Sequence, residues 1–77
     1  MNNIATLKDL KRGQRARVRA LDSTGGIRRR LLDIGLIEGT EVECLGKSPA
    51  GDPTAFLIRG AVIALRAEDS GNVRIFC

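Results

Sequence analysis

Residues 25–39 read GGIRRRLLDIGLIEG, and this is the one stretch of the chain that combines helical spacing, stop signals and concentrated charge. On a helical wheel, Ile27, Leu31 and Ile34 fall on one face. That face is predicted to pack on the core. The opposite face carries arginines and is predicted to meet water or a partner.

Glycines mark the limits of this predicted helix. Gly35 is expected to end it, because glycine tolerates the left-handed conformation that follows a last turn, and Leu36 then folds back onto the apolar face. Gly39 opens the next strand. Gly25 and Gly26 precede the helix either as a flexible turn or as a point where another molecule approaches the backbone closely.

Three consecutive arginines, Arg28, Arg29 and Arg30, spread around most of the helix. Arg28 and Arg29 are predicted to be exposed, where they either contact a partner or only keep the protein soluble. Arg29 can pair with Asp33 one turn later, and Arg30, nearest the buried face, can brace Glu38.

Elsewhere the pattern has a period of two, which is typical of half-buried strands. The predicted strands are residues 14–21, 40–46, 54–58, 62–66 and 73–75. In the first strand, Ala16, Val18 and Ala20 face inward and an arginine stripe faces outward. In the second, Val42 and Cys44 face inward.

Turn signals separate these strands. Thr6 is predicted to cap a single helical turn that Gly13 ends, and residues 1–5 are predicted to be loose. Residues 47–53 form a surface loop because their prolines lack the donor that a central strand needs. Arg59-Gly60 has the length of a tight hairpin, and residues 67–70 form a short turn that ends at Gly71.

Five short strands, one helix after the first strand and a small core predict a mainly β domain that spans residues 1–77. With two Phe, no Trp and no Tyr, the core is aliphatic. A partly open SH3-like barrel fits this order best. An OB-type barrel is the alternative, but its helix usually lies between the third and fourth strands.

Charge is divided unevenly along the chain. Residues 1–30 hold nine of the thirteen basic residues and two acids, a net charge of +7, whereas residues 31–77 have a net charge of −3. This distribution indicates a negatively charged partner, which can be an acidic protein surface, anionic lipid or nucleic acid, or it only keeps the surface soluble.

Catalytic and metal-binding arrangements are missing from the sequence. The chain has no histidine, and its two cysteines are too far apart for a zinc or redox motif. Cys44 is predicted to be a core residue and Cys77 an exposed end. We therefore expect no enzyme, no cofactor and no metal site. No apolar run reaches membrane-spanning length and no signal peptide is present, which predicts a cytoplasmic protein.

The motifs GGIRRRLLDIGLIEGT, PAGDPTAF and RGAVIALR, in this order and spacing, resemble the FeoA family of small cytoplasmic proteins of bacterial ferrous iron uptake. The resemblance covers residues 7–75 and implies an SH3-like barrel, similar to the C-terminal domain of metal-dependent repressors. It also implies a partner, the membrane permease FeoB with its cytoplasmic GTPase domain, at the inner face of the membrane.

On this resemblance we expect a non-enzymatic docking module with two groups of important residues. The predicted partner-binding residues are Arg28, Arg29, Arg30, Lys47, Asp52 and Pro53. The predicted structural residues are Gly26, Leu31, Asp33, Gly35, Gly39 and Gly60. An arginine finger is disfavoured, because a finger needs a mobile, protruding arginine and these sit on a helix that is committed to the core.

Two other functions compete with docking. A nucleic-acid-binding barrel is favoured by the basic first strand and helix, but the chain lacks aromatic side chains on which bases stack. Direct iron handling needs ligands that this sequence does not supply, since histidine is absent and thiols are few.

Overall fold

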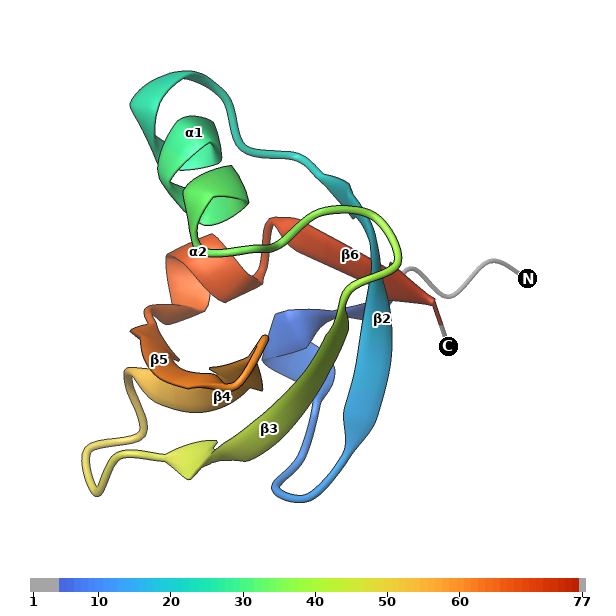
Figure 1. Cartoon of the computed structure of the whole chain (residues 1–77). Helices are drawn as coiled ribbons and strands as arrows, with labels where there is room; N and C mark the ends of the chain where they lie inside the picture. The colour runs from blue at the N-terminus through green and yellow to red at the C-terminus, as the bar shows by residue number, and fades with distance from the viewer. Residues whose placement is uncertain (1–4, 77) are drawn as a thin grey trace.

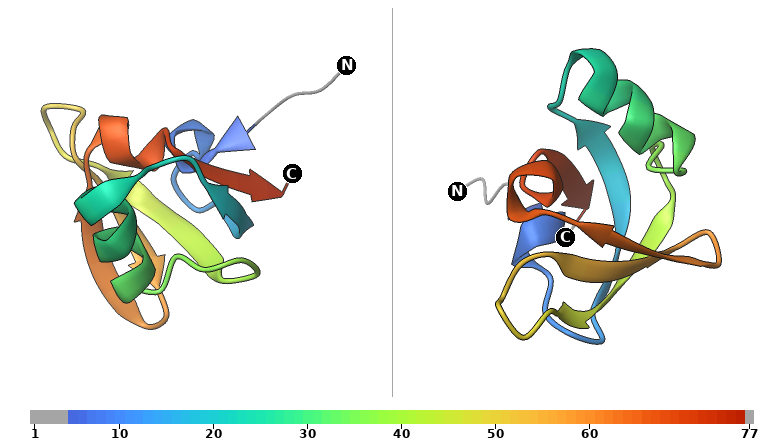
Figure 2. Two further views of the ribbon diagram at one scale, coloured as in Figure 1. Left: turned by 90° about the horizontal axis from the view of Figure 1, so that it is seen from above. Right: turned by 90° about the vertical axis from the view of Figure 1, so that its left-hand side faces the viewer.

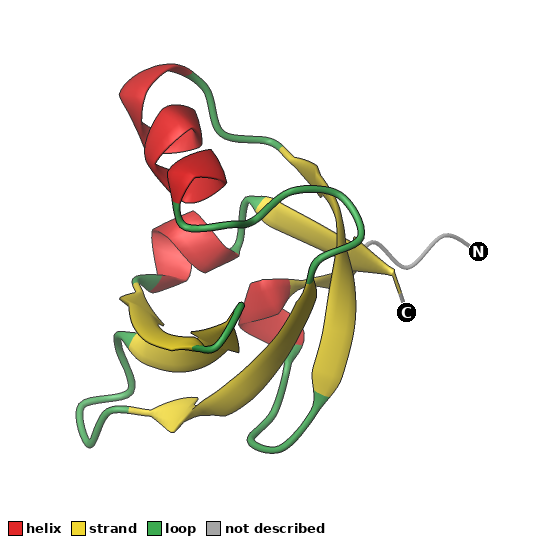
Figure 3. Ribbon diagram, in the orientation of Figure 1, coloured by secondary structure: helices red, strands yellow, loops and turns green. Residues whose placement is uncertain are grey.

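The structure is a computed structural model, and it describes residues 5–76. Six antiparallel strands form one curved sheet in the order β1-β6-β2-β3-β4-β5, with three short helical segments between them (Figures 1 and 3). The elements are β1 (Ala5–Thr6), the 3₁₀ helix η1 (Leu7–Asp9), β2 (Arg15–Leu21), α1 (Gly25–Asp33), β3 (Glu41–Lys47), β4 (Thr54–Ile58), β5 (Ala61–Leu65), α2 (Ala67–Ser70) and β6 (Val73–Phe76).

The alternating pattern of the strands produces the core. Val18 of β2 and both Val42 and Cys44 of β3 are buried, as predicted, while the arginines of β2 face outward. The core is almost wholly aliphatic around a single ring, that of Phe56, which is fully buried on β4. The buried set comprises Leu7, Val18, Leu31, Leu36, Val42, Cys44, Phe56, Ile58, Leu65, Val73 and Ile75.

Helix α1 ends as the glycine signal predicted. Gly35 has φ +105°, its N–H donates to the carbonyl of Leu32 at 3.0 Å, and the N–H of Leu36 donates to the carbonyl of Leu31 at 3.1 Å. These two bonds make a Schellman motif, and the accompanying apolar contact is between the buried Leu31 and Leu36. The motif fixes the direction in which the chain leaves the helix.

The start of α1 differs from the prediction. Ile27 was expected in the core with Leu31 and Ile34, but its side chain is 52% exposed. All residues from 25 to 30 are exposed, and burial begins at Leu31. Burial of the helix is therefore confined to its last turn and the segment that follows. Figure 2 shows α1 at one end of the curved sheet.

Two further details correct the prediction, and two predictions are not tested. Ala5 and Thr6 form a sixth strand, β1, which pairs with β6 through Ala5 and Ile75. Lys47 ends β3 opposite Thr54 and does not open the loop. The predicted looseness of residues 1–4 and the predicted exposure of Cys77 lie outside the described residues.

The β4–β5 hairpin turns on two residues, as predicted. Ile58 and Ala61 are partners across the strands, and the central pair, Arg59 and Gly60, have φ of +50° and +84°. Positive φ at both central positions is what a type I′ turn requires. Glycine adopts this conformation without strain, whereas Arg59 adopts it as a non-glycine residue.

Candidate functional site

The arginines of α1 are all exposed, and neither predicted ion pair is present among the described residues. The ion pairs found there use other arginines, Arg15 with Glu43 and Arg74 with Asp22. Arg28 donates from Nη1 to the carbonyl oxygen of Leu21 at 3.4 Å. No carboxylate of the described chain therefore forms an ion pair with the guanidinium groups of α1. These groups are exposed to solvent.

Arg30 and Pro53 meet across one groove. A concavity of about 370 Å³ lies between α1, the loop before β4, β5 and α2. It is lined by Ile27, Arg30, Pro53, Ala64, Arg66, Glu68 and Asp69. Two predicted partner-binding segments that are distant in sequence thus share a surface. We call this surface the helix-side groove.

The other predicted partner-binding residues are placed elsewhere. Arg28 and Arg29 lie on a shallow hollow of α1 with Gly25 and Gly26. Asp52 accepts a hydrogen bond through Oδ1 from the N–H of Ala67 at 2.8 Å, so it caps the start of α2.

Lys47 belongs to a different face. It lines a concavity with residues of η1 and of the turn after it. The structure therefore brings together only part of the predicted set.

The predicted structural residues have distinct environments. Leu31 is 2% exposed and anchors α1, whereas Asp33 is exposed. Gly39 has φ +89°, and its N–H donates to the carbonyl of Val18 at 2.8 Å, which ties the loop after α1 to β2. Gly26 does not have a positive φ, and a Cβ there would meet no atom within 4 Å.

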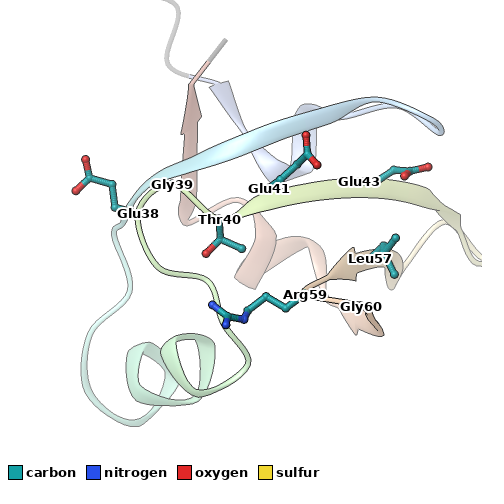
Figure 4. Close-up of a pocket in the computed structure, with 8 residues that line it drawn as sticks. All are labelled: Glu38, Gly39, Thr40, Glu41, Glu43, Leu57, Arg59 and Gly60. Carbon is teal, nitrogen blue, oxygen red and sulfur yellow. The ribbon is translucent and has the colours of Figure 1, made fainter.

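Arg59 was missed by sequence reasoning. A Cβ on Gly35 would lie 2.4 Å from its Cδ, so the stem of Arg59 crosses the backbone where α1 ends. Figure 4 shows Arg59 reaching from the β4–β5 turn towards the segment after α1. The available signal was the two-residue turn, which demands positive φ at its first position as well as at Gly60.

The face around Arg59 is a concavity of about 570 Å³. Glu38, Glu41 and Glu43 also line it, but Figure 4 shows their carboxylates spread along the segment before β3 and along β3 itself. Across residues 5–76, no group of three His, Cys, Asp or Glu side chains is close enough to hold a metal ion. The helices found in this range are too short or too polar to cross a membrane.

This curved sheet, with its short helices and aliphatic core, defines the class of small SH3-like barrels. A family model, the FeoA domain, matches residues 5–75. The chain belongs to the FeoA family.

Solved structures agree with this assignment. A FeoA protein from Chlorobium tepidum is 31% identical, with a TM-score of 0.86 over 92% of this chain and 68% of that one. A FeoA from Stenotrophomonas maltophilia, complexed with zinc, is 28% identical, with a TM-score of 0.83 over 94% of this chain and 89% of that one. That protein is described as a prokaryotic SH3 domain protein and a candidate activating factor of ferrous iron transport.

More distant likeness concerns the fold alone. A manganese-dependent transcriptional repressor is 15% identical over 99% of this chain and 37% of its own, with a TM-score of 0.84. The comparison with curated proteins returned no match.

Proposed function

We propose that this protein is a non-enzymatic accessory factor of ferrous iron uptake that docks on the cytoplasmic GTPase domain of the membrane permease FeoB. Membership of the FeoA family supports the link to ferrous iron transport. The proposal places the protein in the cytoplasm, at the inner face of the membrane, with iron as the cargo of its partner.

The observation that carries the docking proposal is the state of the α1 arginines. Arg28, Arg29 and Arg30 form no ion pair with a carboxylate among residues 5–76, and all three are exposed. Because Leu31 anchors the far end of the helix, little backbone freedom is lost when a partner binds these arginines. Such a surface fits an acidic patch on another protein.

The helix-side groove extends this surface. It adds exposed apolar area from Ile27 and Pro53 beside Arg30, and its remaining lining includes Arg66, Glu68 and Asp69. Apolar contact flanked by charge is the usual composition of a protein interface. In this proposal Asp52 acts by holding the start of α2, which forms one side of the groove, and Lys47 supplies charge on a separate face.

Docking is better supported than direct participation in GTP hydrolysis. An arginine finger has to extend a guanidinium group into another protein's active site. Here the three arginines lie on a helix that Leu31 anchors, Arg28 donates to the carbonyl of Leu21 at 3.4 Å, and Arg30 lines a groove. We therefore propose that the protein regulates or supports transport by binding.

The experiment measures binding of the purified chain to the cognate permease and to its isolated GTPase domain by biolayer interferometry. Arg29→Glu and Arg30→Glu are each expected to weaken binding about tenfold or more, since charge reversal places like charges across the interface. The matched control is Arg19→Glu, the same charge change on β2, where Arg19 contacts the ring of Phe76 at 6.0 Å. Unchanged affinity in both α1 variants would refute the docking surface.

The nucleic-acid alternative has weaker support. Arg15 of the basic β2 face is paired with Glu43, with 3.4 Å between Nε and Oε1. The exposed Phe76 lies under Arg19, and the other phenylalanine, Phe56, is buried. A base-stacking surface of the usual kind would need an uncovered aromatic ring. Gel-shift measurements at several salt concentrations test this alternative.

A further inference from the structure

A second concavity, on a different face from α1, concentrates positive charge. It measures about 730 Å³ and lies between η1, the turn that follows η1, and the end of β3. Four cations line it: Lys8, Lys11, Arg12 and Lys47. We call it the basic pocket. In Figure 1 its elements are the blue segment before β2 and the far end of β3.

The cations of the basic pocket are not neutralised within residues 5–76. Its only carboxylate belongs to Asp9, which already accepts hydrogen bonds from the N–H of Thr6 at 2.9 Å and from its hydroxyl at 3.4 Å. The ion pairs of the described chain lie elsewhere. Four cations line this concavity against a single carboxylate, that of Asp9, and together they produce a focused positive potential.

The turn that carries Lys11 and Arg12 is held in place. The Lys11 N–H donates to Oε1 of Gln14 at 2.7 Å, and the Gln14 N–H donates back to the Lys11 carbonyl at 2.9 Å. Two more bonds tie the turn to β3, from Gly13 N–H to the Cys44 carbonyl at 2.8 Å and from Cys44 N–H to the Gln14 carbonyl at 2.9 Å. The backbone that carries the two cations is therefore fixed with respect to β3.

Arg12 lies against that strand beside a glycine. Gly46, at the register shift of β3, has φ +128°, and a Cβ there would be 3.6 Å from Cδ of Arg12. The stem of Arg12 thus runs along the bulged backbone. Leu10 and Leu45 add apolar lining. The pocket combines a charged part with an apolar part, as an amphiphilic anion requires.

We propose that the basic pocket binds a phosphate ester, with the phosphate group against Lys11, Arg12 and Lys47 and the apolar body of the ligand against Leu10 and Leu45. Phosphate matches this donor set because arginine binds it through a planar fork and lysine through a point charge. A soluble nucleotide and a lipid headgroup share this chemistry. The proposal does not depend on docking through α1, which lies on another face.

The test uses the full chain and three probes. Calorimetry measures binding of pyrophosphate and of ATP, and flotation measures binding to phosphatidylcholine vesicles with and without phosphatidylglycerol. The variant Lys11→Gln/Arg12→Gln removes two cations and keeps polar side chains. Because one basic group near an anionic surface contributes about a factor of five, affinity is expected to fall about thirty-fold. Lys47→Gln is expected to lower it about five-fold.

The matched control is Arg19→Gln, which removes one charge outside the pocket and is expected to bind as the parent chain does. Melting temperatures of all variants establish that they remain folded. Binding of ATP alone assigns a soluble phosphate ester, and binding of phosphatidylglycerol vesicles alone assigns a lipid headgroup.

Three results would overturn the proposal. One is no saturable binding of any probe. Another is an equal loss of affinity in Arg19→Gln and the pocket variants, which would reduce the effect to net charge. The last is binding of pyrophosphate, ATP or vesicles that is unchanged in Lys11→Gln/Arg12→Gln, which would place the anion site elsewhere.

Discussion

Replacing Gly35 with alanine is expected to destabilise the protein through two separable effects. The first is backbone strain, because φ at Gly35 is +105° and an L-residue in left-handed conformations costs about 1–2 kcal/mol. The second is a clash, since the new Cβ would lie 2.4 Å from Cδ and 3.2 Å from Cγ of Arg59. Moving the Arg59 side chain out of its rotamer costs about 1 kcal/mol more.

Gly39→Ala is the matched control. Gly39 also has a left-handed conformation, φ +89°, but a Cβ there would meet nothing within 4 Å. This variant therefore incurs the backbone strain without the clash. Thermal unfolding followed by circular dichroism compares the two variants. Since 1 kcal/mol shifts the melting temperature of a domain of this size by about 4–8 °C, Gly35→Ala should melt about 4–8 °C below Gly39→Ala.

The role of Arg59 is tested by a double-mutant cycle. In an Arg59→Ala background the clash is absent, so Gly35→Ala should cost no more than Gly39→Ala. Position 59 keeps its positive φ of +50° in this background, so the strain of the turn is unchanged. Equal melting temperatures of the two glycine variants in the parent chain, or an excess that persists without Arg59, would refute the reasoning.

Two other substitutions test how α2 and α1 are held. Asp52→Ala removes the acceptor that lies 2.8 Å from the Ala67 N–H and should cost about 1 kcal/mol of folding stability, which lowers the melting temperature by about 4–8 °C. The control is Glu41→Ala at an exposed position, which should change stability by less than about 0.5 kcal/mol. Leu31→Ala should cost about 2–5 kcal/mol in urea unfolding because Leu31 is 2% exposed, and Ile27→Ala far less because Ile27 is 52% exposed. A loss at Ile27 as large as that at Leu31 would contradict the placement of the helix.

The helix, its stop and most strands follow from local signals. Gly35 ends α1, and the alternation in β2 and β3 places Val18, Val42 and Cys44 in the core. A helix stop and a strand's alternation can be predicted from sequence because each depends on a few neighbouring residues. The short strand β1 was not predicted, because its two residues form a strand only by pairing with β6.

The candidate site was predicted less completely than the fold. The exposure of Arg28 and Arg29 was predicted from helical spacing, but the exposure of Arg30 and the lack of ion-pair partners within residues 5–76 were not. Pairings of Arg29 and Arg30 were expected because the acids are near in sequence. On a surface, the solvation of both groups and the entropy of long side chains offset the attraction.

The sequence by itself determined the order and the approximate limits of five strands, the helix and the turns between them, because period, glycine and proline act over a few residues. Only the tertiary structure decided which distant segments meet. In the structure, Arg30 and Pro53 line one groove, and the side chain of Arg59 lies against Gly35. Lys47 lines the basic pocket and not the surface of α1. Those neighbours depend on the curvature and register of the whole sheet, which are properties of the packed core and of no single stretch of chain.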